Sequence, residues 1–333
     1  MHTPLTDDTK AIMLLCGVFG EDHAVDPLTQ TEYNTLARWL FNQQMRPGDL
    51  LRQENWNAAT IGASFGIRGE RLKALLGRGV SLGFAVEEWQ RNGIWVISRS
   101  DEDYPERYKR HLKDKAPPLI FGVGDRSQVQ GGGVAIVGAR NVDAEGEDFA
   151  RKSATLCAHN KMPVVSGGAR GVDWIAMTAA LEAGGVTIGI LADNLLKKSL
   201  DRDTRSPISE GRLLLLSPYP PNARFTAGAA IGRNKLIYAL ADYGLVVSAD
   251  YKKGGTWTGA TEELKRGNSL TIFIRTGENV PLGNKKMLEL GAIEWPAVDA
   301  PDRLDQQLAE VAKSTERNSV EEKPALQMPL PLP

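Results

Sequence analysis

Apolar and polar residues follow two different periods in two successive parts of the chain. Up to residue 98, apolar positions such as Leu72, Leu75 and Leu76 recur at helical spacing, and the glycine-containing stretches GIRG and GRGV interrupt them. This pattern predicts a small helical domain over residues 1–98. A connector over residues 99–130 follows, in which prolines such as Pro105 end the helical stretches and the extended stretch IFGVG starts the next domain.

From Gly131 onward, short apolar runs such as VAIVG, VTIGI and RLLLLS alternate with longer helical stretches. Continuous apolar runs are typical of buried parallel strands, and their alternation with helices is typical of βαβ units. We therefore predict an α/β fold for residues 131–313, with a doubly wound, mostly parallel sheet and about six strands between Ala135 and Ile274. Residues 314–333 are charged and then rich in proline, which predicts a disordered tail.

Composition narrows the classes of function. The 40 basic and 41 acidic residues give a net charge of −1, so a site for nucleic acid must be a local patch. No apolar run is long enough to cross a bilayer, and the chain does not start with a basic and then apolar segment. We expect a cytoplasmic protein without a membrane partner. Cys16 and Cys157 stand far apart and are expected to be core thiols.

Three glycine-rich loops follow predicted strands, and each carries or adjoins a cation. Ligands of doubly wound sheets bind beyond the carboxyl ends of the strands, where glycines let backbone N–H groups approach an anion. The chain has neither a GxxxxGK[ST] motif nor a dinucleotide fingerprint. We predict a phosphate site made by Gly138, Ala139, Arg140, Ser166, Gly167, Gly168, Arg170, Gly171, Lys252, Lys253, Gly254, Gly255 and Thr256.

Further cations and aromatic residues are expected at the same edge of the sheet. Arg233, Asn234 and Lys235 open another helix there. An aromatic side chain beside a basic groove can stack on the bases of a single strand, and Phe225 and Trp257 are candidates for this role. The alternatives are that the aromatic residues are core positions and that the cations form surface ion pairs, Arg170 with Asp173 and Lys235 with Asp242.

The sequence offers few candidates for catalytic residues. No histidine adjoins a glycine loop, so the motifs do not assemble a nucleophile with its base or a metal cluster. The Ser166 hydroxyl is better interpreted as an anion ligand than as a nucleophile, because no base is evident beside it. We predict a binding protein rather than an enzyme, with no metal and no cofactor.

These motifs resemble the DNA-processing protein A (DprA/Smf) family over residues 101–277. The connector DEDYPERYKRHLKDKAPPLIFGVG, then VGAR, SGGARGVDWIAMTAAL, RNKLIYALAD and GGTWTGATEELKRG stand in the family's order. The segment 1–98 is similar, more loosely, to a SAM or helix-hairpin domain. The chain departs from the family pattern in having RNK in place of RNR and Ser248 where an acidic residue is expected.

The resemblance implies an extended Rossmann-like domain that binds single-stranded DNA in a basic pocket during DNA processing and recombination. It also implies a homodimer and the loading of a RecA-type recombinase, as in natural transformation. Carried over by position, Arg140, the Ser166–Gly171 loop, Arg233 and Lys235 would contact phosphate. Phe225 would stack on a base.

A second resemblance leaves another class of function open. The stretch GGTWTGATEEL is similar to the PGGxGTxxE turn of the cytokinin-activating phosphoribohydrolases (LOG proteins). The alternative is therefore a nucleotide sensor or a LOG-like enzyme, with Glu262 or Glu263 as acid or base and Arg170 on the phosphate. Natural transformation, recombination and phage defence remain open as pathways, and a scaffold role for the helical segment or the tail is a third possibility.

Overall fold

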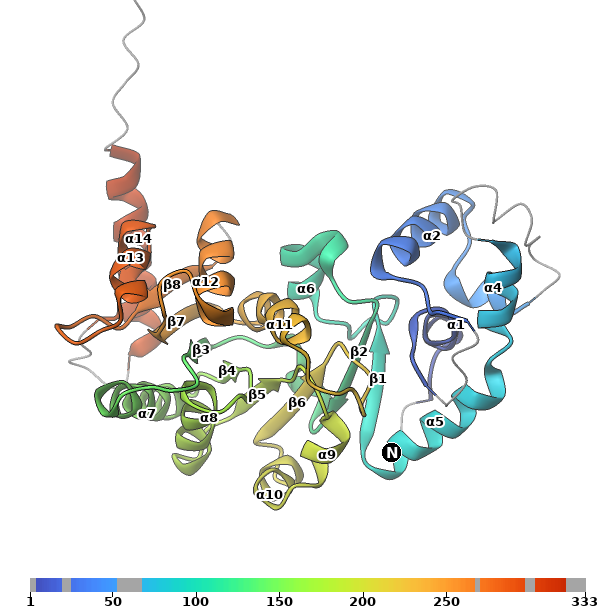
Figure 1. The fold of residues 1–333 in the computed structure, drawn as a ribbon, viewed down its shortest axis with the longest axis horizontal. Helices are drawn as coiled ribbons and strands as arrows, with labels where there is room; N and C mark the ends of the chain where they lie inside the picture. The colour runs from blue at the N-terminus through green and yellow to red at the C-terminus, as the bar shows by residue number, and fades with distance from the viewer. Residues whose placement is uncertain (1–3, 20–24, 53–67, 267–269, 297–302, 322–333) are drawn as a thin grey trace, which may run out of the picture.

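A computed structural model describes residues 4–19, 25–52, 68–266, 270–296 and 303–321 (Figure 1). The N-terminal part is helical, as predicted. Thr29 caps its second helix, because the Thr29 hydroxyl accepts the Glu32 N–H and the Glu32 carboxylate accepts the Thr29 N–H. The elements of this part are α1 (Asp7–Cys16), α2 (Gln30–Asn42), the short helix η1 (Pro47–Leu51), α4 (Gly69–Leu76) and α5 (Gly79–Arg91).

The described residues form one nine-stranded sheet in the order β1-β2-β6-β5-β4-β3-β7-β8-β9. The β1–β2 and β2–β6 pairs are antiparallel and the remaining pairs are parallel. The strands are β1 (Ile94–Ser98), β2 (Leu119–Val123), β3 (Val134–Gly138), β4 (Val164–Ser166), β5 (Thr187–Ile190), β6 (Leu213–Ser217), β7 (Tyr243–Ser248), β8 (Thr271–Ile274) and β9 (Ile293–Glu294).

This arrangement confirms the α/β, doubly wound and mostly parallel sheet, with strands β3 to β8 as the six strands expected from the apolar runs. The chain adds β4, β5 and β6 on one side of β3 and then returns to place β7, β8 and β9 on the other side. The strand order therefore reverses between β3 and β7. In open α/β sheets the carboxyl edge at such a reversal is where ligands bind.

Helices cover both faces of the sheet (Figure 1). One face packs against α6 (Glu106–Leu112), α11 (Ala227–Leu240), α12 (Gly254–Arg266) and α13 (Leu282–Glu289). The other face packs against α7 (Ala144–His159), α8 (Val172–Glu182) and α14 (Leu304–Glu321). Helices α9 (Leu195–Leu200) and α10 (Arg202–Ser209) connect β5 to β6, and the short helices η3 (Lys113–Lys115) and η4 (Arg126–Gln130) flank β2.

The structure corrects two boundaries of the predicted domains. Residues 94–98, placed in the helical domain, form strand β1 of the sheet, and the connector contributes β2 as the expected start of the α/β part. Leu36 of α2 and Leu75 of α4 share one apolar cluster with Val96 of β1 and Phe121 of β2, so the helices and the sheet have a common core. At the other end, α14 continues to Glu321, past the boundary placed at residue 314. Residues 322–333 of the expected tail lie outside the described residues.

Two smaller expectations concern the cysteines and the membrane. Cys157 is buried and Cys16 is half-buried, both are free thiols, and burial raises the pKa of each to about 12. In the part of the chain that the structure describes, no helix combines the length and the apolar character needed to cross a membrane.

Candidate functional site

Two hollows open at the carboxyl edge of the sheet. The first hollow, of about 470 Å³, lies where the strand order reverses and is lined by the ends of β3 and β7 and the beginnings of α11 and α12. The second hollow, of about 590 Å³, is lined by the loops after β4 and β5 and by α9. Residues common to both are Arg140, Asn141, Ala169, Phe225 and Arg233.

Exposed side chains form the boundary between the two hollows. The Arg140 guanidinium lies over the Phe225 ring, with 5.0 Å between Cζ and the ring centroid. Phe225 is 49% exposed, so part of its ring is open to solvent. Arg170 is also exposed and lines the second hollow, where its Nη2 donates to Asn141 Oδ1 over 2.7 Å. The structure therefore gives Arg170 an amide partner, and the ion pair with Asp173 considered from the sequence is wrong.

A buried carboxylate ties two of the glycine loops together. The N–H groups of Gly138, Ala169 and Gly167 donate to Asp173, which stands at the beginning of α8. Burial raises the pKa of Asp173 to about 6, and Arg233 and these N–H groups oppose the rise. Three of the amides predicted to bind phosphate are thus engaged within the protein. The loops supply the shape of the site, while charge for a ligand comes from side chains.

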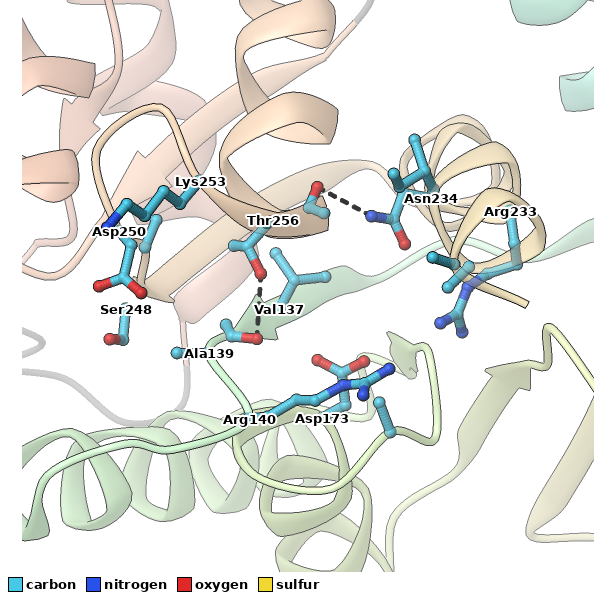
Figure 2. A pocket seen from close by; sticks show the side chains of 18 of the residues that line it. Val137, Ala139, Arg140, Asp173, Arg233, Asn234, Ser248, Asp250, Lys253 and Thr256 are labelled. Carbon is cyan, nitrogen blue, oxygen red and sulfur yellow. Dashed lines mark hydrogen bonds between the residues drawn. The ribbon is translucent and has the colours of Figure 1, made fainter. Parts of the chain in front are cut away.

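Arg233 lies beneath the exposed residues. It is only 4% exposed, and its Nη1 donates to the carbonyl oxygens of Gly167 and Ile190. Burial lowers the pKa of Arg233, and Asp173 opposes this effect. A Cβ on Gly167 would overlap both Arg233 Nη1 and Asp173 Oδ2, which explains why glycine is needed at this position. The Arg140 and Arg233 guanidinium groups both point into the first hollow (Figure 2).

Hydrogen bonds fix the two helices that border the first hollow. Thr226 begins α11, because its hydroxyl accepts the Ala229 N–H. Asn234 Nδ2 then donates to the Gly255 carbonyl oxygen over 2.9 Å, which joins α11 to α12. Thr256 Oγ1 donates to the Gly138 carbonyl oxygen over 3.0 Å, which joins α12 to the end of β3 (Figure 2). Asn234 and Thr256 therefore line the hollow and also hold its walls together.

Most of the predicted site residues meet at these hollows. The first hollow brings together Gly138, Ala139, Arg140, Arg233, Asn234, Lys253, Gly254, Gly255 and Thr256. The second adds Gly167, Gly168 and Arg170. Gly171 lies under the β3 loop with φ +90°, where a Cβ would overlap the carbonyl oxygens of Ala139 and Arg140.

Other predicted residues lie elsewhere. Ser166 is fully buried and its hydroxyl donates to the Ile136 carbonyl oxygen over 2.6 Å, so it supports β3 and does not face a ligand. Lys235 is half-buried on α11, outside both hollows, and Lys115 and Arg266 add to the effect of burial in lowering its pKa. The expected ion pair of Lys235 with Asp242 is wrong, because Asp242 pairs with Arg107.

Four further candidates also lie outside both hollows, namely Lys252, Trp257, Glu262 and Glu263. The half-buried Trp257 packs edge-on against Tyr251, with ring centroids 5.0 Å apart, and the Lys252 ammonium lies over the same Tyr251 ring. Glu263 is buried and pairs with Arg266. Neither Glu262 nor Glu263 reaches the site, so the acid or base role considered for them has no structural support.

Three residues that line the second hollow were not predicted from the sequence. Lys197 and Lys198 line it from α9, and Asn141 lies between Arg140 and Arg170. Lys198 pairs with Asp201 over 2.9 Å, and its ammonium lies over the Trp174 ring. The two lysines follow strand β5, so the rule that ligands bind beyond strand ends could have found them. The loop after β5 contains no glycine, so the glycine-rich turns that marked the other loops did not indicate these two lysines.

Comparison with known proteins gives the family. Residues 95–300 match the family model described as DNA recombination-mediator protein A. The chain is 32% identical over 194 residues to the putative DNA processing protein DprA of Mycobacterium tuberculosis, which covers 53% of this chain and 48% of the relative. It is 26% identical over 225 residues to the DNA processing protein DprA of Bacillus subtilis, covering 66% and 74% respectively. The chain thus spans about half the length of the mycobacterial relative.

Solved structures share the fold of this chain. The X-ray structure of DNA processing protein A from Streptococcus pneumoniae superposes with a TM-score of 0.69 at 20% identity, covering 93% of this chain and 99% of that one. DNA processing protein A from Helicobacter pylori, whose structure concerns its single-stranded DNA binding mode, gives a TM-score of 0.51 at 25% identity and covers 66% and 97%. Since the family model spans β1 to β9 and both hollows, the chain belongs to the DNA recombination-mediator protein A family.

Proposed function

We propose that this protein binds single-stranded DNA across the two hollows, with phosphates at Arg140 and Arg170 and a base stacked on Phe225. One observation carries the proposal. Arg140 and Arg170 come from different loops, both are exposed, and both line the second hollow together with a half-exposed aromatic ring. Bases stack on aromatic rings while cations neutralise phosphates in proteins that hold single strands.

The charge around the second hollow supports an anionic ligand. Five cations line it, namely Arg140, Arg170, Lys197, Lys198 and Arg233, against the two carboxylates Asp193 and Asp201. Like charges held close together repel one another unless counter-charge is present. A phosphate chain supplies that counter-charge, and the structure of the Helicobacter pylori relative concerns single-stranded DNA binding.

The family resemblance also predicts a homodimer, the loading of a RecA-type recombinase, and a role in transformation or recombination. These remain predictions for this chain, because the mycobacterial relative is matched over only about half of its length. The DNA site is the part of the proposal that the hollows support directly.

A fluorescence anisotropy titration tests the proposal, with a labelled single strand and its duplex at several salt concentrations. The single strand should bind more tightly, and the logarithm of the binding constant should fall with the logarithm of salt by about 0.7 per phosphate contacted. Arg140→Gln and Arg170→Gln should each weaken binding and flatten this slope. Arg151→Gln is the control, because Arg151 lies on α7 and pairs with Glu147 and Glu182. Salt-independent binding, or wild-type affinity in both site variants, would refute the proposal.

A further inference from the structure

A third hollow runs along helix α2 in the N-terminal part of the chain. It has a volume of about 490 Å³ and is lined by α2, the beginning of η1, the loop after β1 and η3. It shares no described lining residue with the two hollows at the carboxyl edge of the sheet. Helix α2 lies at the opposite end of the molecule from α13 and α14 (Figure 1). We call this hollow the α2 groove.

Apolar side chains make up much of the α2 groove. Phe41 is 81% exposed, more than any other large apolar side chain in the part of the chain that the structure describes. Ala37 precedes it by one turn of α2, Met45 and Pro47 follow the end of the helix, and the buried Leu40 completes the apolar lining. A single exposed apolar side chain is ordinary, but several that line one hollow are typical of a surface that binds another protein.

Hydrogen bonds fix the shape of the α2 groove. Asn34 Nδ2 donates to the Asp114 carbonyl oxygen and Gln30 Nε2 donates to the Ala116 carbonyl oxygen, each over 2.7 Å, which ties α2 to η3 and the residue after it. Arg99 Nη2 donates to Asn34 Oδ1 over 2.7 Å, which ties the loop after β1 to α2. A ligand therefore meets a groove that is already formed, and less conformational entropy is lost on binding.

Positive charge predominates among the groups that line the groove. Among the described residues these are Arg38, Arg46 and Arg99 against Asp114, an excess of two positive charges. The Arg38 and Arg46 side chains are 65% and 72% exposed, so a ligand can reach their guanidinium groups. Arg38 pairs with the exposed Asp114, and exposed ion pairs contribute little to stability. A carboxylate on a ligand can therefore share or replace this partner.

The balance of charges favours an acidic peptide over a strand of nucleic acid. A strand adds one phosphate with every nucleotide, and Asp114 in the groove and Asp8, which pairs with Arg46, would repel successive phosphates. A peptide can bring only one or two carboxylates, which match the planar donor groups of arginine. Its apolar side chains can then cover the exposed ring of Phe41.

We propose that the α2 groove binds an acidic peptide segment of a partner protein, in which an apolar side chain stands next to the carboxylates. The apolar side chain packs on Phe41 and Met45, and the carboxylates accept hydrogen bonds from Arg38 and Arg46. This inference does not depend on the proposed DNA site. Since the groove and the two hollows have no described lining residue in common, the protein can hold a strand and a partner protein at the same time.

Anisotropy titrations of the whole protein with a labelled peptide test the proposal. The probe is the amidated peptide Gly-Asp-Asp-Leu-Phe. One comparison peptide has lysines in place of both aspartates, and the other has two serines in place of the Leu-Phe pair. The protein should bind the probe about tenfold more tightly than either comparison peptide, because burial of one large apolar side chain alone has about this effect. Binding of the probe should weaken as the salt concentration rises.

Two substitutions locate the peptide site, each with a matched control. Phe41→Ala should weaken binding of the probe about tenfold, and Arg38→Gln about twofold to fivefold. Phe84→Ala is the control for the ring, because Phe84 is 71% exposed but lies on α5 outside the groove. Arg91→Gln is the control for the charge, because Arg91 forms a similarly exposed ion pair with Glu87 on α5. All four side chains are exposed, so the variants should fold, and thermal melting checks this.

The outcomes distinguish a peptide site from other uses of the groove. Absence of probe binding, equal affinity for the three peptides, or unchanged probe affinity in Phe41→Ala would overturn the proposal. Weaker binding of single-stranded DNA by Phe41→Ala, with competition between the strand and the probe, would also overturn it and assign the groove to nucleic acid. Loss of DNA binding in Arg140→Gln with unchanged probe affinity would support two separate sites. If no strand binds but the probe does, the proposed function fails while the peptide site stands.

Discussion

The two layers of the site differ in what they do for the protein. The upper layer consists of Arg140, Arg170 and Phe225, which are exposed and make few bonds to the rest of the chain. The lower layer contains Asp173 and Arg233, which are buried and bond to the backbone of the loops. Residues of the same motifs thus divide into those that can contact a ligand and those that hold the loops in shape. Substitutions in the upper layer should change binding, and those in the lower layer should change stability first.

The largest effect is expected from Arg233→Met. This change removes the donors to the Gly167 and Ile190 carbonyl oxygens. It also removes the cation that offsets the effect of burial on the pKa of Asp173. We expect the free energy of unfolding to fall by about 3–5 kcal/mol, as when one partner of a buried charged pair is lost. Urea denaturation measures this. Arg170→Met, in the upper layer, should cost no more than about 0.5 kcal/mol, and equal losses in the two variants would contradict the division into layers.

A pH dependence should identify the lower layer independently. Because the pKa of Asp173 is raised to about 6, the folded protein binds more protons than the unfolded chain between about pH 4 and pH 6. The contribution of Asp173 to stability is therefore present at low pH and is lost as pH rises to about 6, by up to about 3 kcal/mol. Asp173→Asn should remove this component. Subtracting the profile of unfolding free energy against pH of Asp173→Asn from that of the wild-type protein removes the contributions of the other carboxylates. Parallel profiles would show that Asp173 does not titrate in this range.

Phe225→Ala should weaken DNA binding and leave stability unchanged, in contrast to the lower-layer changes. Loss of a stacking ring should weaken single-stranded DNA binding by about 1–3 kcal/mol. Unfolding should be unaffected within about 0.5 kcal/mol, because the ring is half-exposed. Phe84→Ala on α5 is the control, since Phe84 is 71% exposed and lines neither hollow. If the two variants bind DNA equally well, Phe225 has no stacking role.

Ser166→Ala should have the smallest effect and sharpen the same distinction. The Ser166 hydroxyl donates to the Ile136 carbonyl oxygen inside the protein, so its loss should cost about 0.5–1.5 kcal/mol of stability. The affinity for single-stranded DNA, measured by anisotropy, should stay at the wild-type value. A selective loss of affinity without loss of stability would restore the prediction that Ser166 is an anion ligand.

Much of the fold could be predicted because buried parallel strands are continuous apolar runs. The run VAIVG became β3 and LVVS lies in β7, and the reversal between them places the site. The domain boundary at residue 98 was wrong because IWVIS is an antiparallel edge strand directly after a helix, without a βαβ unit to mark it. The tail boundary was misplaced because the helical pattern of α14 does not stop at residue 314.

The position of the candidate site could be predicted from the sequence, but the orientation of its side chains could not. Strand ends and glycine turns located Arg140 and Arg170, since topology alone brings these loops to one edge. The burial of Ser166 and Arg233 depends on how α8 and α11 pack over the loops, which spacing in the sequence does not reveal. Lys235 illustrates the same limit, because one position along α11 from Asn234 turns its side chain away from the hollow.

The common core of the N-terminal helices and the sheet bears on how this protein can be dissected. Leucines of α2 and α4 are packed in the same hydrophobic cluster as residues of β1, β2 and β6. Calorimetry of the whole chain should therefore give one melting transition for both parts. A fragment that begins at β1 would expose the apolar side chains of β1, β2 and β6 that the N-terminal helices cover. It should therefore aggregate when expressed alone.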